Sequence, residues 1–193
     1  MHIFYGDYMD YIETWKEVIQ RPSDFYRKMP TTGGYTDPLT FAAISYAIYG
    51  LLTALFNRGM MMGDMYGGSR GFSLSTALMT AISAPIVGII SIFIGAAILY
   101  IIYKVLGGTG TYEGTVRFVS YATAVLVVSW IPLIGLIGWI YEIYLNILGG
   151  AFVHNVSMGK SAIAVLLPAI LIFLLVMIVA LVAFSSSVVS SFI

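Results

Sequence analysis

The chain of 193 residues is 60% hydrophobic and only 9% charged, with nine basic and nine acidic side chains and no net charge at pH 7. A soluble domain of this size cannot hide so much apolar surface, so we expect an integral membrane protein with an all-α fold. The balanced charge gives no basic surplus for nucleic acid, and the absence of cysteine excludes disulfides, thiolate nucleophiles and cysteine metal sites.

The first unit, residues 1–37, carries charge throughout and lacks the apolar core of a cleaved signal peptide. Five apolar side chains share one helical face: Tyr11, Ile12, Trp15, Val18 and Ile19. Pro22 ends this helix or begins a second one over 23–29. We expect an interfacial helix pair with aromatic side chains in lipid and cations toward phosphate. The alternative is a cytoplasmic cap packed on the loops of its own bundle.

Five apolar runs follow in a second unit, residues 38–184, each near the roughly 20 residues that cross a bilayer. They occupy residues 38–56, 74–103, 115–131, 133–153 and 161–184. Pro132 separates the third run from the fourth and predicts a tight transmembrane hairpin. A short serine-rich tail, 185–193, ends the chain.

The loop after the first run is rich in methionine, and its thioethers surround Asp64: Met60, Met61, Met62 and Met65. Thioethers bind Cu(I), but we favour an apolar, lid-like loop and predict no metal and no cofactor. In the second run, small residues step along one helical face: Ala84, Gly88, Ser91 and Gly95. Such a face lets helices approach closely in lipid, so we assign it to helix packing. Pro85 predicts a kink or an interfacial first turn.

A polar turn containing Gly107, Gly108 and Gly110 leads into the third run. Glu113 precedes Arg117 by four residues, the favourable order for an ion pair at a helix start, and we expect Arg117 to snorkel to phosphate level. No phosphate-loop lysine follows the glycines. The predicted membrane-surface residues are Trp15, Phe25, Tyr26, Arg27, Lys28, Glu113 and Arg117.

Glu142 lies midway along the fourth run, one turn before Asn146 on the same face. An ionised carboxylate there costs on the order of several kcal/mol, so it must be paired, solvated or protonated. We group Glu142 and Asn146 with Tyr121 and Tyr144 as a candidate intramembrane polar site. The site is either proton- or cation-coupled, or a neutral glutamic acid hydrogen-bonded inside the bundle. Arg117 enters too shallowly to reach it.

His154 ends the fourth run, close to Ser157. A lone histidine there is typical of a hydrogen bond at a helix end, and a catalytic base is the less favoured interpretation. The chain lacks the metalloprotease, nucleophile-elbow and phosphate-loop motifs. We therefore predict no catalytic residues.

Lysine and arginine are unevenly distributed across a five-span arrangement. One side carries seven: Lys16, Arg21, Arg27, Lys28, Lys104, Arg117 and Lys160. The other side carries two, Arg58 and Arg70. The positive-inside rule therefore places the N-terminus in the cytoplasm and the C-terminus outside.

An ordered set of short motifs resembles the Yip1-domain family, most closely its prokaryotic branch. The matching positions, over about residues 15–180, are RPSDFYRKM, Gly107-Gly108, Tyr121-Ala122, Pro132, Gly135, Gly149-Gly150, His154, Ser157 and Lys160-Ser161-Ala162. The resemblance implies five spans, a cytoplasmic N-terminus and the plasma membrane of a prokaryote. Eukaryotic members are linked to Rab GTPases and vesicle traffic between the endoplasmic reticulum and the Golgi. This chain lacks their long N-terminal region, so we do not expect Rab binding.

Three functions remain open. We favour a non-enzymatic protein that organises or shapes membrane, with lipids, other membrane proteins or copies of itself as partners. The first alternative is a small transporter or channel with a proton- or cation-linked site at Glu142 and Asn146. The second is a membrane enzyme that uses His154 and Ser157.

Overall fold

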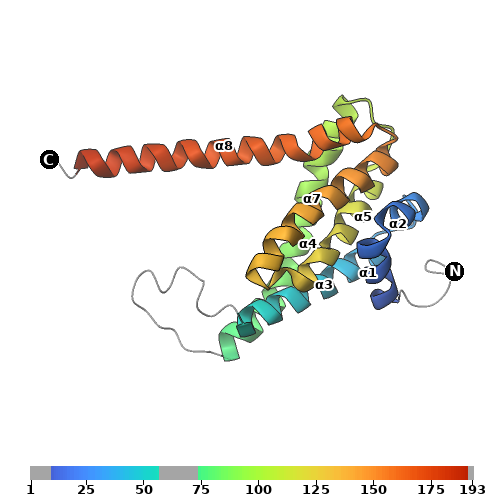
Figure 1. Cartoon of the computed structure of the whole chain (residues 1–193), viewed down its shortest axis with the longest axis horizontal. Helices are drawn as coiled ribbons and strands as arrows, with labels where there is room; N and C mark the ends of the chain where they lie inside the picture. Colours follow the sequence, from blue (N-terminus) through green and yellow to red (C-terminus); the bar gives the residue numbers. More distant parts are fainter. Residues whose placement is uncertain (1–9, 57–73, 191–193) are drawn as a thin grey trace.

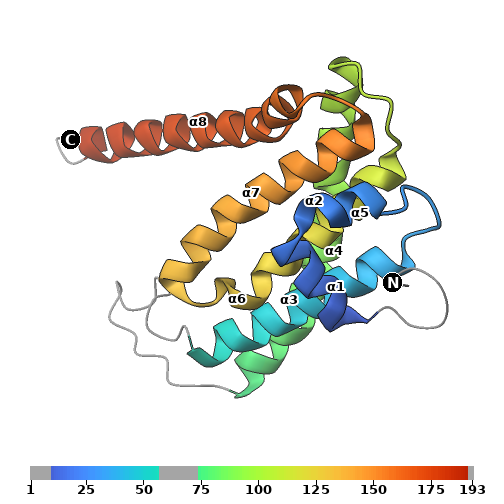
Figure 2. The ribbon, with the colours of Figure 1, turned by 45° about the vertical axis from the view of Figure 1, so that its right-hand side comes forward.

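The computed structural model describes residues 10–56 and 74–190, and every regular element in these two ranges is helical (Figures 1 and 2). The elements are α1 (Tyr11–Gln20), α2 (Pro22–Lys28), α3 (Thr36–Phe56), α4 (Leu74–Val105), α5 (Tyr112–Ala122), the 3₁₀ turn η2 (Thr123–Val125), α6 (Leu126–Ser129), α7 (Pro132–His154) and α8 (Met158–Ser190). The predicted all-α class is confirmed for the described residues. The methionine-rich loop lies outside them.

Four helices are long and apolar enough to cross a membrane: Thr36–Phe56, Leu78–Val105, Pro132–His154 and Met158–Val182. The predicted third span, 115–131, is not among them, because it is divided into α5, η2 and α6. Its hydroxyls contribute to the interruption, since Ser120 and Thr123 donate to the backbone carbonyls of Val116 and Ser120 at 2.8 and 2.6 Å. Residues 114–118 and 120–125 are buried, so most of α5 and all of η2 face protein, whereas α6 has no buried residue.

Helices α3 and α4 form the longest packed pair in the described structure (Figure 2). Gly50 of α3 lies against Ala84, and Gly88 of α4 lies against the ring of Tyr46. Ala84 and Gly88, which the sequence assigns to helix packing, both lie in this contact. The predicted packing role is wrong for the other two small residues, because Ser91 is exposed and Gly95 has open space beside it.

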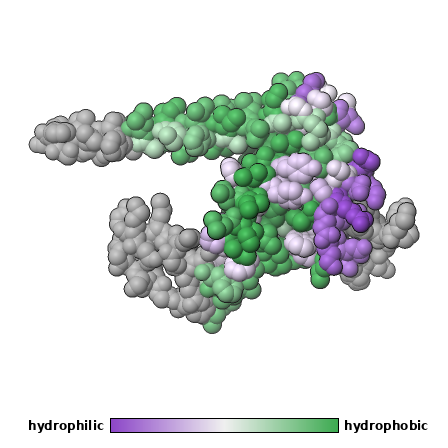
Figure 3. All heavy atoms as spheres, in the orientation of Figure 1, coloured by the Kyte–Doolittle hydropathy of each residue, from purple (hydrophilic) through white to green (hydrophobic). Residues whose placement is uncertain are grey.

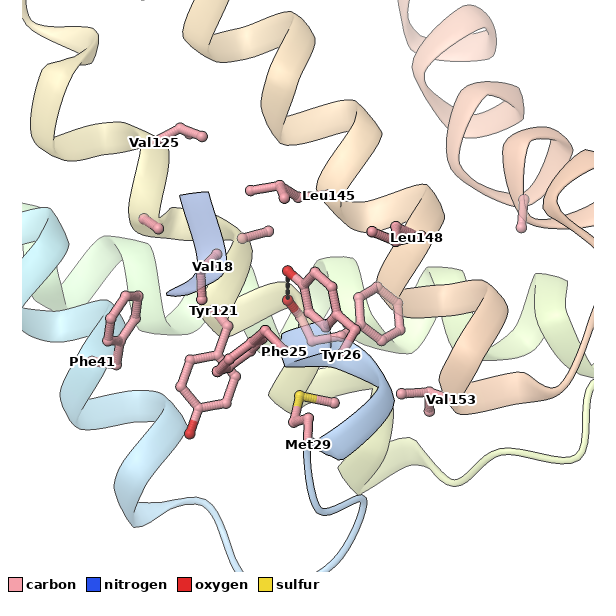
Figure 4. Close-up of a cluster of buried hydrophobic side chains, with 14 of the residues drawn as sticks. Val18, Phe25, Tyr26, Met29, Phe41, Tyr121, Val125, Leu145, Leu148 and Val153 are labelled. Carbon is pink, nitrogen blue, oxygen red and sulfur yellow. Dashed lines mark hydrogen bonds between the residues drawn. The ribbon is translucent and has the colours of Figure 1, made fainter. Parts of the chain in front are cut away.

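The N-terminal segment is helical where the apolar face predicts it. Asp10 caps α1 by accepting from the backbone N–H groups of Ile12 and Glu13, and Pro22 occupies the first turn of α2. Figure 4 shows that Phe25 and Tyr26 of α2 lie in one buried cluster with Tyr121 of α5. We call α1 and α2 together the N-terminal cap.

Helix α8 leaves the other helices and extends away from them (Figure 1). Ser161 and Ala164 in its first turns are buried against the bundle, whereas nearly every side chain from Leu166 to Val182 is exposed. The helix continues to Ser190, so most of the predicted serine-rich tail extends α8. In Figure 3 polar residues gather over the N-terminal cap, and apolar residues cover α8 and the opposite end of the bundle.

Candidate functional site at the junction of the cap and the bundle

Trp15 anchors the cap to the interrupted helix. Its indole Nε1 donates to the backbone carbonyl of Ala124 in η2 at 2.8 Å. Ala124 is fully buried, so this carbonyl has no access to water, and the indole N–H satisfies an acceptor that would otherwise be costly to bury. The aromatic side chain that the sequence assigns to lipid is thus half-buried against protein.

Two further hydrogen bonds hold α1 against the long helices. The Tyr141 hydroxyl, in the middle of α7, donates to the Ile19 carbonyl at 2.7 Å. The hydroxyls of Tyr11 and Ser45 lie 2.9 Å apart and join α1 to α3. Helix α1 therefore packs against the middle of α3 and α7, and not against their ends.

The outer face of the cap is charged. Glu13, Lys16 and Arg21 are exposed, and Lys28 lies 3.8 Å from Glu17. The inner face is packed on protein, since Phe25 and Tyr26 are 0% and 2% exposed. The lipid-facing position predicted for these two aromatics is wrong, and the alternative, a cap packed on its own bundle, describes them better. Arg27 and Lys28 are exposed, as surface residues should be.

Glu113 and Arg117 meet through a third residue. The backbone N–H of Gly34 donates to Glu113 Oε1 at 2.7 Å, and Arg117 Nη1 donates to the Gly34 carbonyl at 2.5 Å. The carboxylate and the guanidinium therefore bind the two backbone polar groups of one residue, Gly34, in the linker between α2 and α3. Gly33 and Gly34 have φ of 115° and 86°, which glycine adopts without strain. The expected snorkelling is wrong, because Arg117 is only 2% exposed.

Two buried polar atoms on this face of α5 have no hydrogen-bond partner within the described chain: Arg117 Nε and the Tyr121 hydroxyl. Asp37, in the first turn of α3, lies close enough to Tyr121 for its charge to act on the hydroxyl, as does Arg117. In Figure 4 the Tyr121 hydroxyl points away from α7 and from Tyr26. Tyr121 therefore belongs with Arg117 and not with Glu142.

Glu142 and Asn146 share one face of α7, as the spacing predicts. Asn146 Nδ2 donates to the Glu142 backbone carbonyl at 3.0 Å, and Asn146 Oδ1 is buried without a partner in the described residues. The Glu142 carboxylate is close to the cap: burial raises the pKa of Tyr26 well above its usual value, and the Glu142 charge raises it further. Tyr144 is 41% exposed and lies outside this group.

His154, the last residue of α7, is buried and contacts residues of α4 and α5. Its ring stacks on Tyr103 with centroids 4.1 Å apart, and its Nε2 lies 2.8 Å from Thr115 Oγ1. Because Thr115 donates its hydroxyl hydrogen to the Thr111 carbonyl at 2.9 Å, Nε2 must be the donor to Thr115. Ser157 is exposed, and its hydroxyl accepts from the Lys160 backbone N–H while His154 Nε2 pairs with Thr115, so in the described structure the two do not form a nucleophile–base pair.

Several residues of this junction carried no recognised signal in the sequence. Tyr11 and Ser45 are ordinary apolar-helix residues by pattern, and Tyr103 reaches Ser161 at 2.6 Å across 58 positions. The adjacent glycines Gly33 and Gly34 were the available clue to the linker contact, because two consecutive glycines indicate left-handed backbone. Within the described ranges, no group of three or more histidine or acidic side chains is arranged to hold a metal ion.

Comparison with known proteins gives one match. A family model described as the Yip1 domain matches residues 16–181, which is most of the chain. No curated protein matches the sequence, and no solved structure matches the fold.

Proposed function

The chain belongs to the Yip1 domain family, and on this premise we propose that it is a non-enzymatic membrane protein that shapes the bilayer around it. The observation that carries the proposal is that the exposed apolar surface is short on the side that carries the N-terminal cap and long on the outer face of α4. A bilayer that covers both sides must change thickness around the protein.

The short side lies under the N-terminal cap. Tyr141 is hydrogen-bonded to the end of α1, whose outer face carries exposed Glu13 and Lys16, so the headgroup boundary passes near the middle of α7. Only residues 132–140 of α7 lie beyond it, nine residues or about 13 Å. The large side chains exposed there are apolar: Leu133, Ile134, Leu136, Ile137, Trp139 and Ile140.

The long side is the outer face of α4. Its candidate span, Leu78–Val105, has 28 residues, or about 42 Å of helix. Isoleucines are exposed along most of that length: Ile82, Ile86, Ile90, Ile94, Ile98 and Ile101. Hydrocarbon is about 30 Å thick, so we infer that the bilayer thins beside the cap while α4 tilts within it. Several copies side by side would add these distortions together and bend the membrane.

Imaging of the full chain in large lipid nanodiscs tests the proposal. We expect thinner bilayer beside the cap than beside α4. Combining Trp15→Phe with Tyr141→Phe removes two anchors of the cap without changing charge, and should reduce the asymmetry. Tyr144→Phe makes the same chemical change at an exposed tyrosine of α7 and should leave the difference in bilayer thickness unchanged. Uniform thickness around the native protein would refute the proposal.

We also propose a cytoplasmic N-terminus, an external C-terminus and a location in the plasma membrane of a prokaryote. Gly110 lies against His154 at the end of α7, and the Trp130 ring packs at a tilt on Phe56 at the end of α3, with ring centroids 4.8 Å apart. These contacts at the two ends support a passage of α5, η2 and α6 across the membrane, as the third of five.

Transport remains a second candidate because Asn146 Oδ1 is buried and unpartnered in the described chain, one turn from Glu142. A proton or cation would need such acceptors. Flux through proteoliposomes distinguishes this function from membrane shaping.

A further inference from the structure

We propose that Arg117 and Tyr121 form a binding site for the phosphate of an amine-bearing phospholipid headgroup, and that the Gly34 peptide closes this site in the present structure. The proposal goes beyond membrane shaping and does not depend on it.

The first argument is the unused hydrogen-bonding capacity. Arg117 is 2% exposed and Tyr121 is 0% exposed, yet Arg117 Nε and the Tyr121 hydroxyl have no partner in the described residues. A buried donor without an acceptor destabilises the protein, and more so when the donor is charged. The two residues are one turn apart on α5, where side chains lean toward the helix start, so both donors serve one position. A phosphate oxygen is the acceptor that suits a guanidinium and a hydroxyl.

The second argument is the pattern of charge. Arg117 contributes one positive charge, whereas two negative charges lie around the pair: Glu113 accepts from the Gly34 N–H, and the charge of Asp37 acts on the Tyr121 hydroxyl. A free phosphate would meet net repulsion there. A phosphoethanolamine headgroup fits better, because its phosphate would face Arg117 and Tyr121 while its ammonium faces the two carboxylates.

The third argument is that the group now closing the site can be exchanged for a stronger acceptor. The Gly34 carbonyl is the acceptor that Arg117 Nη1 now uses, and the linker is held there by the additional bond to Glu113. Gly34 is exposed, and nothing lies within 4 Å of the position its Cβ would take. Displacement of Gly34 would break both bonds and would give Arg117 a charged acceptor in place of a neutral one, and charged acceptors bind guanidinium more strongly.

Titration of the purified full chain in detergent tests the site, with native mass spectrometry to count bound lipid. The probes are dioctanoyl-phosphatidylethanolamine, dioctanoyl-phosphatidylglycerol and inorganic phosphate. We expect the ethanolamine lipid to bind most tightly. Tyr121→Phe should weaken it roughly 10- to 100-fold, the worth of a hydrogen bond to a charged group, without lowering the thermal midpoint.

Tyr26→Phe is the matched control. The Tyr26 hydroxyl donates to the Phe118 carbonyl at 3.4 Å, so its loss should lower the thermal midpoint and leave lipid affinity unchanged. Equal binding by the native chain and the Tyr121→Phe variant would overturn the proposal. Inorganic phosphate or the glycerol lipid binding as tightly as the ethanolamine lipid would overturn it too, because neither carries an amine.

Discussion

The hydroxyl of Tyr141 donates a hydrogen bond to the backbone carbonyl of Ile19 at 2.7 Å, across 122 positions of the chain. It joins the middle of a long apolar helix to the last turn of a charged amphipathic one. Together with the bond from Trp15 to Ala124 at 2.8 Å, it makes the N-terminal cap part of the folded bundle. The cap should therefore contribute to the stability of the whole protein.

Trp15→Phe should lower the free energy of unfolding by about 1–3 kcal/mol. The substitution keeps an aromatic ring but leaves the buried Ala124 carbonyl without its indole donor. Unfolding of the purified protein in mixed micelles measures the change. Lys16→Gln, at an exposed position one residue away, should stay within about 0.5 kcal/mol. Equal stability of both variants would mean that the cap is not anchored as described.

Gly110→Ala should destabilise the protein by about 2–3 kcal/mol. A Cβ at Gly110 would lie 2.6 Å from the Val153 carbonyl oxygen and 2.8 Å from His154 Nδ1, and backbone cannot move aside cheaply. Gly95→Ala is the control, since its Cβ would meet nothing within 4 Å and alanine favours helix by roughly 1 kcal/mol. The same unfolding assay should give opposite signs. A tolerated Gly110→Ala would contradict the close approach of the 106–111 turn to His154.

Glu142→Gln should leave the fold and its stability intact if Glu142 is structural, because glutamine retains the volume and the hydrogen bonding. Glu142→Ala should cost about 1–2 kcal/mol more than Glu142→Gln through the lost packing and hydrogen bonding. Proteoliposomes loaded with a pH-sensitive dye provide the second measurement, and we expect no proton flux from the native chain. A native flux that disappears in the folded Glu142→Gln variant would make transport the better proposal.

Reporters at the two termini test the topology. An odd number of passages requires that a reporter active only in the cytoplasm works before Met1 and is silent after Ile193. Activity at both ends would show an even number of passages. In that case the segment α5–η2–α6 would not carry the chain across the membrane.

The elements with long apolar periodicity were predictable from the sequence. Helices α3, α4, α7 and α8 lie where the apolar runs predict them, and α1 follows its amphipathic face. Hydropathy did not predict that residues 115–131 form three short elements packed on protein, because a segment buried by its own protein and a segment buried by lipid need the same apolar composition. Only the hydroxyls of Ser120 and Thr123 indicated that this helix would be interrupted.

The junction was less predictable, because its contacts join positions far apart in the chain. The spacing of Glu113 and Arg117 predicted a direct ion pair, but in the described structure each side chain bonds to the backbone of Gly34, which no local pattern could place between them. Phe25 and Tyr26 have the composition of a membrane-surface helix, and their burial depends on an apolar partner surface formed by Phe118 and Tyr121. The shared face of Glu142 and Asn146 could be predicted, because it follows from their spacing along one helix. The proximity of Glu142 to the cap could not, because it joins distant parts of the chain.

The anchors of the cap also set an order of events during synthesis. Ala124 and Tyr141 are made 109 and 122 residues after their partners Trp15 and Ile19. At about 5–20 residues per second, the cap waits roughly 6 to 24 seconds for its docking surface. During that interval no protein surface covers the apolar face of α1 in the ribosome-bound chain. We expect this face to bind the nearby membrane surface instead. A ribosome that stalls before residue 124 would leave this helix at the bilayer surface.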